Sequence, residues 1–404
     1  MTILPGYQHF NGRHWETGTI CNALAYRGVA APHTGQPFSE AFLMGVSGGV
    51  LMGYFSFAYS GHDPHVALLS RNTFDPLDTL LGRLGIVQHR RHATNAAKGL
   101  SNLAEVLEEG QPAIVWADAF SLPYTGLQPA ADMWANFPIV VYGLDVARDK
   151  VWIADRAAVP LTVTPAELAA ARARVKKDRF RVLTIEPPVP AKLASAVRQG
   201  IADCLRRYVE APVKTAKANF GLAAYDHWAD LLTTNKHRQS WSRVFPAGAP
   251  LYAGLSTAYD HFGIGVVAAL RDRGLYADFL EEAAPILKRP ALKEAATAFR
   301  ACVPGWRALG EALLPETSRP LRRTRELLDQ RRAVFIEKGE RALPTRRRID
   351  SRLSEIRRDL TKSFPLDGSE VRDLCVDIAT QVRAIGNVER LAYEALRKAM
   401  AGRG

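Results

Sequence analysis

The spacing of apolar residues changes character along the chain. In the first half, short runs rich in β-branched and aromatic residues lie between turn residues, a pattern typical of strands. It predicts strands at 113–117, 137–142, 151–154 and 181–185. The last three are close enough together to form an antiparallel meander, and the polar residues 144–150 have the length of a hairpin connection. We therefore expect an α/β domain with a mostly antiparallel sheet here.

Helical signals accompany these strands. Residues 17–26 predict a short helix, and a second helix is expected from Pro165 to Arg174, because proline suits a first helical turn and Thr164 before it is a favourable N-cap. The apolar, glycine-rich residues 45–53 lack the GK[ST] sequence of a phosphate-binding loop. We expect their glycines to allow close packing beneath the helix at 17–26.

Helical periodicity dominates the second half. Three prolines within residues 187–190 cannot continue a helix or pair in a central strand, so they indicate a connector and a domain boundary near residue 188. Beyond it, helices are predicted at 191–210, 212–232, 275–287, 290–299 and 371–400. The expected division is an α/β domain at 1–188 and an all-helical domain at 189–404, which would act as a lid or in homodimerisation.

Composition limits the class of protein. Apolar residues make up 47% of the 404 residues, which is enough for two packed cores. No uninterrupted apolar run approaches the ~20 residues that span a bilayer, and the first ten residues lack the basic and apolar regions of a signal peptide. We expect a soluble, cytoplasmic protein that has no membrane partner.

Cysteine and histidine spacing does not predict a cofactor. The four cysteines lie far apart without a CxxC pair, which argues against a zinc site or a disulfide framework. Two histidine pairs, 62/65 and 89/92, have spacings that could bind a metal, but such pairs in polar loops are more often solvated. No metal and no other cofactor is expected. The cysteines are Cys21, Cys204, Cys302 and Cys375.

Much of the net charge of +12 lies in one stretch. Residues 319–359 contain thirteen arginines and one lysine against seven acidic residues. Such a stretch is most often a solvated helical face, and the main alternative is a docking surface for an acidic protein. Phe335 is the one aromatic residue among these arginines, which argues against a platform for stacking bases. Nucleic acid is therefore not an expected partner.

Residues that could carry chemistry lie just before the first predicted helix. The segment Gly12-Arg13-His14-Trp15-Glu16-Thr17 ends where that helix begins. A side chain at such a position lies among unpaired backbone N–H groups at the positive end of the helix dipole. This environment lowers the pKa of a thiol and supplies donors for an oxyanion, and papain-like enzymes place their cysteine there.

Several segments carry a family resemblance. Gly12, His14, Glu16 and Thr17 fit the pattern G-x-H-C-E-T, in which cysteine follows histidine. Other segments also match the family pattern. They are Ser39-Glu40 and the glycine-rich segment after it, Asp118 and Leu122-Pro123-Tyr124, residues 136–145 and 151–155, and residues 275–284. In this order they resemble the N-terminal domain of the butirosin biosynthesis protein H family and the helical domain that commonly follows it.

The resemblance implies a papain-like cysteine-peptidase fold, of the α+β class, and acyl transfer. In that chemistry an aminoacyl group moves from a carrier-protein thioester, through an acyl-enzyme, to a small-molecule amine. The nucleophile, the base and the orienting carboxylate would fall on Trp15, Asn136 and Asp155. An indole N–H cannot attack a carbonyl and a neutral amide has no useful pKa near 7, so only the carboxylate is retained. The implied pocket residues are His9, His14, Glu16, Thr17, Asp118 and Tyr124.

Two functions remain open. In the first, the protein is a non-catalytic relative whose site binds a partner, such as an acyl carrier protein or another acidic protein, with help from the basic helices at 319–359, or a small-molecule amine. In the second, it still forms acyl or amide bonds with displaced residues, or by positioning carrier-bound substrate and amine. Cys21, six residues beyond Trp15, could act only in a rearranged site.

Overall fold

The computed structural model describes residues 1–404 except 11, 128–133, 178, 262 and 402–404. These residues divide into two units, each made of three segments. Unit 1 comprises Met1–Leu43, Leu77–Leu193 and Arg331–Arg348, and unit 2 comprises Met44–Pro76, Ala194–Gln330 and Ile349–Gly404. This division is based on packing and does not follow the single domain boundary near residue 188 that the sequence suggests. That boundary stays a prediction.

Unit 1 is built on an antiparallel sheet. Its strands lie in the order β4-β9-β5-β6-β7-β8, and β1 also pairs with β6. All of these pairings are antiparallel, which confirms the mostly antiparallel sheet expected from the sequence. The strands are β1 (Thr2–Ile3), β4 (Gln88–Arg91), β5 (Ala113–Asp118), β6 (Asn136–Asp145), β7 (Lys150–Ala154), β8 (Leu161–Val163) and β9 (Val182–Ile185).

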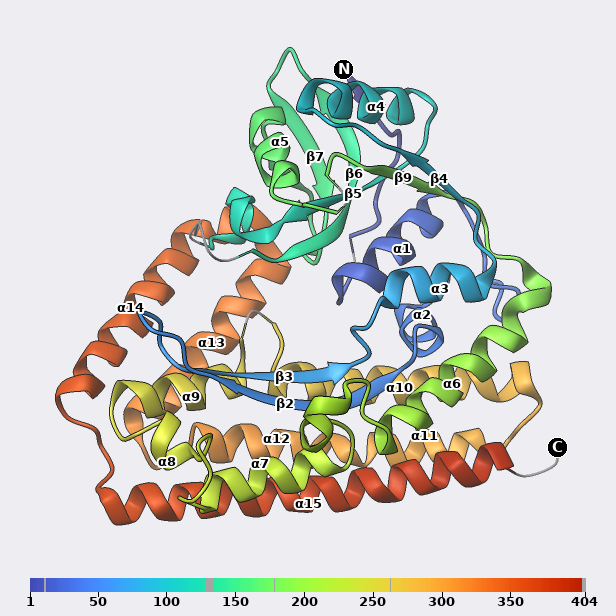
Figure 1. Ribbon diagram of the computed structural model, residues 1–404. Helices are drawn as coiled ribbons and strands as arrows, with labels where there is room; N and C mark the ends of the chain where they lie inside the picture. The colour runs from blue at the N-terminus through green and yellow to red at the C-terminus, as the bar shows by residue number, and fades with distance from the viewer. Residues whose placement is uncertain (11, 128–133, 178, 262, 402–404) are drawn as a thin grey trace. The chain divides into compact units, whose positions relative to one another are not determined.

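The predicted helices of unit 1 are present. α1 (Trp15–Tyr26) contacts β6, and α5 (Pro165–Ala173) contacts β5 (Figure 1). The start of α5 is a capping box, in which the Thr164 hydroxyl accepts from the Glu167 N–H and the Glu167 carboxylate accepts from the Thr164 N–H. Other helical segments are α3 (Pro76–Leu84), α4 (Ala96–Glu108), η1 (Ala119–Ser121), η2 (Pro123–Thr125), η3 (Pro190–Lys192) and η5 (Gly339–Ala342).

The predicted meander is wrong in its third strand. β6 and β7 form the expected hairpin, with Asp145 opposite Lys150 at its closed end. β9 instead pairs with β4 and β5, and β8 takes the free edge of β7. β8 is three residues long, which is too short to give a clear strand pattern. It follows β7 more closely along the chain than β9 does, and the shorter connection favours its pairing with β7.

Unit 2 is helical apart from one hairpin, which joins β2 (Val50–Phe57) to β3 (His65–Arg71). Its helices are α6 (Leu193–Val209), α7 (Ala223–Thr233), α8 (Trp241–Val244), α9 (Ala249–Tyr259), α10 (Val266–Leu287), α11 (Leu292–Arg300), α12 (Cys302–Leu313) and α15 (Gly368–Ala401). Five helices have residues in both units: α3 and α6, each by its first residue, and α2 (Glu40–Val46), α13 (Arg319–Lys338) and α14 (Leu343–Lys362). The helical second half is thus confirmed. No helix in the described part of the chain is both long and apolar enough to cross a membrane.

One predicted helix is interrupted. Residues 212–232 form η4 (Lys214–Asn219) and all but the last residue of α7, with a break between them. Gly221 lies in this break with φ of +63°, and a Cβ there would be 2.4 Å from the carbonyl oxygen of Tyr208. The left-handed conformation and the close backbone contact both require glycine, so the helix cannot run through this position.

The glycine-rich residues 45–53 pack on α10. A Cβ on Gly45 would lie 2.1 Å from the ring of Phe279, and one on Gly49 would lie 2.4 Å from the ring of Tyr276. The backbone therefore touches these rings directly, which leaves no room for a larger residue. This finding corrects the expected packing beneath α1, because the glycines serve the core of unit 2.

A fully buried ion pair lies in that core. Arg273 of α10 and Glu389 of α15 have no exposed side-chain surface, and Nε lies 2.7 Å from Oε1. Arg273 also donates to the carbonyl oxygens of Ser70 and Leu51 in the hairpin, at 2.6 and 3.1 Å. The Trp306 indole N–H donates to Glu389 at 2.9 Å. Charge-assisted hydrogen bonds between buried groups thus connect the hairpin with three helices.

Glu389→Gln should destabilise unit 2 strongly. The substitution leaves the buried guanidinium of Arg273 without a counter-charge, and we expect a loss of about 3 kcal/mol in the free energy of unfolding, measured by urea denaturation. Glu394→Gln is the matched control, because Glu394 lies on the same helix and pairs with Arg397 at the surface. Little change is expected there. Equal effects of the two substitutions would contradict the role of the buried pair.

Candidate functional site

One carboxylate holds the N-terminus of α1. Glu40 accepts from the backbone N–H groups of Arg13 and His14, at 2.6 and 2.7 Å, and from the Thr17 hydroxyl at 2.9 Å. His14 Nδ1 lies 3.2 Å from that hydroxyl and 3.5 Å from Glu40 Oε1. His14, Thr17 and Glu40 are buried. A carboxylate at the positive end of a helix is stabilising, so this cluster determines where α1 begins.

Two glycines explain the path of the chain before α1. A Cβ on Gly18 would lie 2.5 Å from Gly12 Cα, and one on Gly12 would lie 3.1 Å from Gly18 Cα. The loop therefore crosses the first turn of the helix in direct backbone contact. This contact is the physical reason for the glycine that opens the motif at residues 12–17.

Trp15, the first residue of α1, is enclosed by two side chains. Its indole stacks on the Phe137 ring with centroids 3.6 Å apart and planes 4° from parallel. The guanidinium carbon of Arg156 also lies 3.6 Å from the indole centroid. Both groups cannot occupy one face at this distance, so they cover opposite faces. Arg156 lies 5.7 Å from the Phe335 ring as well, and Arg346 lies 5.0 Å from that ring. Aromatic stacking and cation–π attraction both stabilise this arrangement.

Asn136, the expected base position, opens β6. It lies opposite Asp118 of β5, so strand alternation directs its side chain to the face of the sheet that carries Asp118. Phe137 points to the other face, where it meets Trp15. The Asn136 Oδ1 is buried and has no hydrogen-bond partner in the described part of the chain.

Asp155, the expected orienting carboxylate, follows directly after β7. It is buried, accepts from the Tyr124 hydroxyl at 3.3 Å, and lies 3.5 Å from Arg156 Nε. Burial, with a further contribution from the Asp155 charge, raises the pKa of Tyr124 well above its usual value, so the phenol remains a donor. At both positions, the side chain that reaches Trp15 is therefore one residue beyond the expected one: Phe137 instead of Asn136 in β6, and Arg156 instead of Asp155 after β7.

Asp118 stabilises the turn after β5. Its carboxylate accepts from the backbone N–H groups of Phe120 and Ala135 and from the Ser121 hydroxyl. Arg174 Nε lies 2.7 Å from Asp118 Oδ2. The side chain is fully buried, so these contacts use the carboxylate for capping and for an ion pair inside unit 1.

The remaining expected pocket residues lie around the start of α1. Glu16 is in the first helical turn, where its charge favours the helix. His9 is half-buried and lies edge-on to Tyr7, with ring centroids 5.8 Å apart. Burial lowers the pKa of His9, which keeps the imidazole neutral near pH 7. His9 therefore belongs to an aromatic cluster with Tyr7, and its predicted role in a pocket stays a prediction.

Sequence reasoning missed the side chains that enclose Trp15. Arg156 is adjacent to an expected site residue, but cation–π pairing depends on tertiary contacts and leaves no local pattern. Phe335 comes from a distant part of the chain. Glu40 had a signal, because it lies in the Ser39-Glu40 segment that matches the family pattern.

The arrangement offers no exposed nucleophile in the described part of the site. Thr17 is 1% exposed, and its hydroxyl donates to Glu40. Cys21 donates to the carbonyl oxygen of Phe38, and burial together with the nearby Glu40 charge raises its pKa to about 12. The described residues also contain no group of three or more His, Cys, Asp or Glu side chains placed to bind a metal ion.

Fold and site together define an α+β domain in which the first turn of a helix meets two strands of an antiparallel sheet. Residues 14–156 match the family model described as butirosin biosynthesis protein H, N-terminal. The family resemblance of this part of the chain is thereby confirmed, and the helical remainder is consistent with a follower domain. No curated protein matches the chain.

The four thiols should react slowly in the native protein. Burial raises the pKa of Cys21 and Cys204 to about 12 and of Cys375 to about 11, and it also raises the pKa of Cys302. At pH 8 each thiolate is at least about 100-fold rarer than that of an ordinary cysteine. We expect iodoacetamide labelling to accelerate only above about pH 10, and four labels after denaturation. Fast labelling of Cys21 at pH 8, assigned by peptide mapping, would contradict this assignment.

Proposed function

We propose that the protein is a non-catalytic relative of carrier-protein-dependent aminoacyl transferases, with a papain-like scaffold in which the former nucleophile site serves in binding. The family match of residues 14–156 supports an origin among acyltransferase-like proteins of biosynthesis. The four cysteines are free, in agreement with the predicted cytoplasmic location. The observation that carries the proposal is the enclosure of Trp15 between Phe137 and Arg156.

Acyl transfer through an enzyme thioester makes chemical demands that this site does not meet. A nucleophile must attack the carbonyl carbon while the carrier thiol leaves, and a base must accept the nucleophile's proton. An indole covered on both faces provides neither a reactive lone pair nor space for the carbonyl. A shift of the alignment by one residue gives the same result, because Phe137 and Arg156 cannot accept a proton.

An acidic protein, such as an acyl carrier protein, is the proposed partner. Part of the positive charge in α13 and α14 is used within the helices, as in Arg352 with Glu355 at 2.6 Å. Arg347 and Arg348 are exposed and have no ion pair in the described part of the chain. These two arginines would therefore be available to an acidic surface.

An intact-mass experiment tests whether catalysis is lost. The protein is incubated with an aminoacyl carrier thioester, and no acyl adduct and no transfer to an added amine are expected. An adduct on any residue would overturn the proposal and support the alternative, an active acyltransferase with displaced residues.

Restoring a thiol tests whether the site descends from an acyltransferase. We expect Trp15→Cys to react with iodoacetamide at pH 7 faster than Trp134→Cys, an exposed control, because the helix N-terminus and Arg156 lower a thiol pKa. Combining Trp15→Cys with Asn136→His or with Phe137→His should give an acyl adduct in one of the two variants. The variant that reacts shows whether residue 136 or residue 137 occupies the position of the base. If no variant exceeds the Trp134→Cys control, this ancestry is wrong.

Charge reversal tests the proposed partner. Arg347→Glu with Arg348→Glu should weaken binding of an acyl carrier protein about 10-fold in calorimetry and reduce its dependence on salt. Arg390→Glu with Arg397→Glu changes the net charge equally at exposed positions of α15 and serves as the control. Equal losses in both double variants would indicate non-specific attraction, and unchanged binding in both would rule out the arginine pair as the docking surface.

A further inference from the structure

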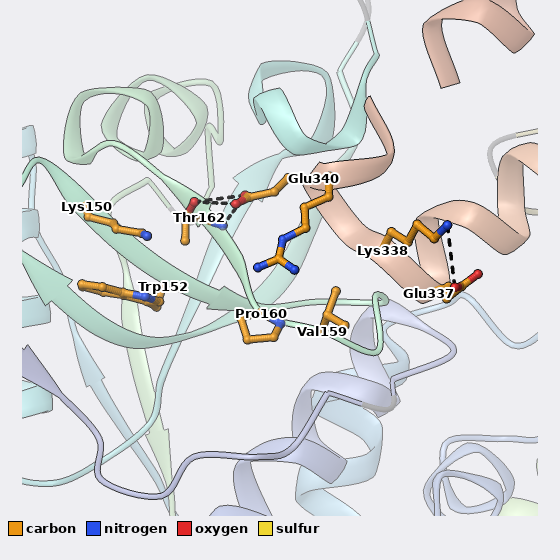
Figure 2. A pocket seen from close by; sticks show the side chains of 9 residues that line it. Lys150, Trp152, Val159, Pro160, Thr162, Glu337, Lys338 and Glu340 are labelled. Atoms are coloured by element: carbon orange, nitrogen blue, oxygen red, sulfur yellow. Dashed lines mark hydrogen bonds and ion pairs between the residues drawn. The ribbon is translucent and has the colours of Figure 1, made fainter. Parts of the chain in front are cut away.

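A cavity of about 450 Å³ lies in unit 1, outside the stack at Trp15. It is formed where β7 and β8 meet the end of α13 and η5 (Figure 2). Figure 2 shows Lys150 and Trp152 side by side on one wall, with Lys338 and Glu337 across from them. Its volume falls within the usual range for small-molecule sites. The lining residues are Lys150, Trp152, Val159, Pro160, Thr162, Glu337, Lys338, Glu340 and Arg341.

The sheet supplies a flat wall. Trp152 of β7 lies opposite Gly143 on one side and Thr162 on the other. A Cβ on Gly143 would be 3.0 Å from Trp152 Cε3, so the absence of a side chain there lets the indole lie close to the sheet. Lys150, two residues earlier on the same strand, holds its amine 5.2 Å from the indole centroid. An aromatic surface and a positive charge are thus side by side.

One glutamate attaches the opposite wall to the sheet. Glu340 accepts from the Thr162 N–H at 2.7 Å and from the Thr162 hydroxyl at 2.8 Å. The preceding Gly339 has φ of +54°, and a Cβ there would lie 2.7 Å from Leu161 Cδ2. These contacts fix the segment after α13 against β8, so the cavity is already formed without a ligand.

Three cations, Lys150, Lys338 and Arg341, and two carboxylates, Glu337 and Glu340, line the cavity. Both oxygens of Glu340 are occupied by Thr162, and Glu337 lies 3.8 Å from Lys338. Lys150 contacts Trp152 but has no ion pair, and Arg341 has none either, in the part of the chain that the structure describes. A guanidinium and an amine beside an indole can bind a carboxylate together with an aromatic ring.

We propose that this cavity binds a small planar aromatic carboxylate. The ring lies against Trp152, with Val159 and Pro160 as apolar neighbours, and the carboxylate pairs with Arg341 and Lys150. This binding site goes beyond the proposed function and does not depend on the state of residue 15. It therefore remains intact in a Trp15→Ala variant.

Calorimetry and ligand-observed NMR with benzoate and 2-naphthoate test the site directly. Saturable binding is expected for both acids and much weaker binding for benzamide, which lacks the charge. Cyclohexanecarboxylate lacks the flat ring and inorganic phosphate lacks the apolar part, so neither should compete effectively. Absence of saturable binding by both aromatic acids would overturn the proposal, as would equal binding of benzamide or of phosphate.

Substitutions locate the binding site. Arg341→Gln and Lys150→Gln should each weaken benzoate binding about 10-fold, and Trp152→Leu about 5-fold. Arg347→Gln and Trp134→Leu are matched controls at exposed positions outside the cavity and should bind as the wild type does. If Trp152→Leu does not fold, the binding measured for Arg341→Gln tests the proposal, because the exposed Arg341 side chain makes no contact that folding requires. Unchanged binding in Arg341→Gln would place the ligand elsewhere and refute the proposal.

Discussion

Trp15, the first residue of α1, is enclosed between Phe137 and Arg156. A helix N-terminus presents unpaired N–H groups and a positive potential, which in an acyltransferase would favour a thiolate and an oxyanion. Here an indole occupies that position, and a neighbouring guanidinium adds a further positive charge. The electrostatic conditions that favour an anion are thus present at the start of α1, where the first residue carries an indole, which is not a nucleophile.

The surroundings of this position remain specific. Glu40 binds two backbone N–H groups before α1, and the Gly12–Gly18 contact leads the loop across the helix. The buried Asp155 carboxylate accepts from Tyr124 and lies close to Arg156. Backbone N–H groups, a close glycine contact and two buried carboxylates thus define the surroundings of Trp15.

Buried and exposed charged side chains have different roles in this protein. Inside unit 2, Arg273 and Glu389 satisfy each other and the hairpin carbonyls, so their charges contribute to the packing of the core and to nothing outside it. Inside unit 1, Glu340 is held by hydrogen bonds from Thr162 and lines the same cavity as Arg341 and Lys150. The net positive charge seen in the sequence becomes informative only after the internal pairs are known.

The sequence by itself determined the local features: the N-cap at Thr164, the hairpin between β6 and β7, and the helical second half. Each of these depends on residues that are close along the chain or on the chemistry of one side chain. Tertiary structure decided the rest. The place of β9, the packing of the glycines on α10, and the partners of Trp15 depend on segments far apart in sequence, because stacking and close backbone contact carry no local periodicity.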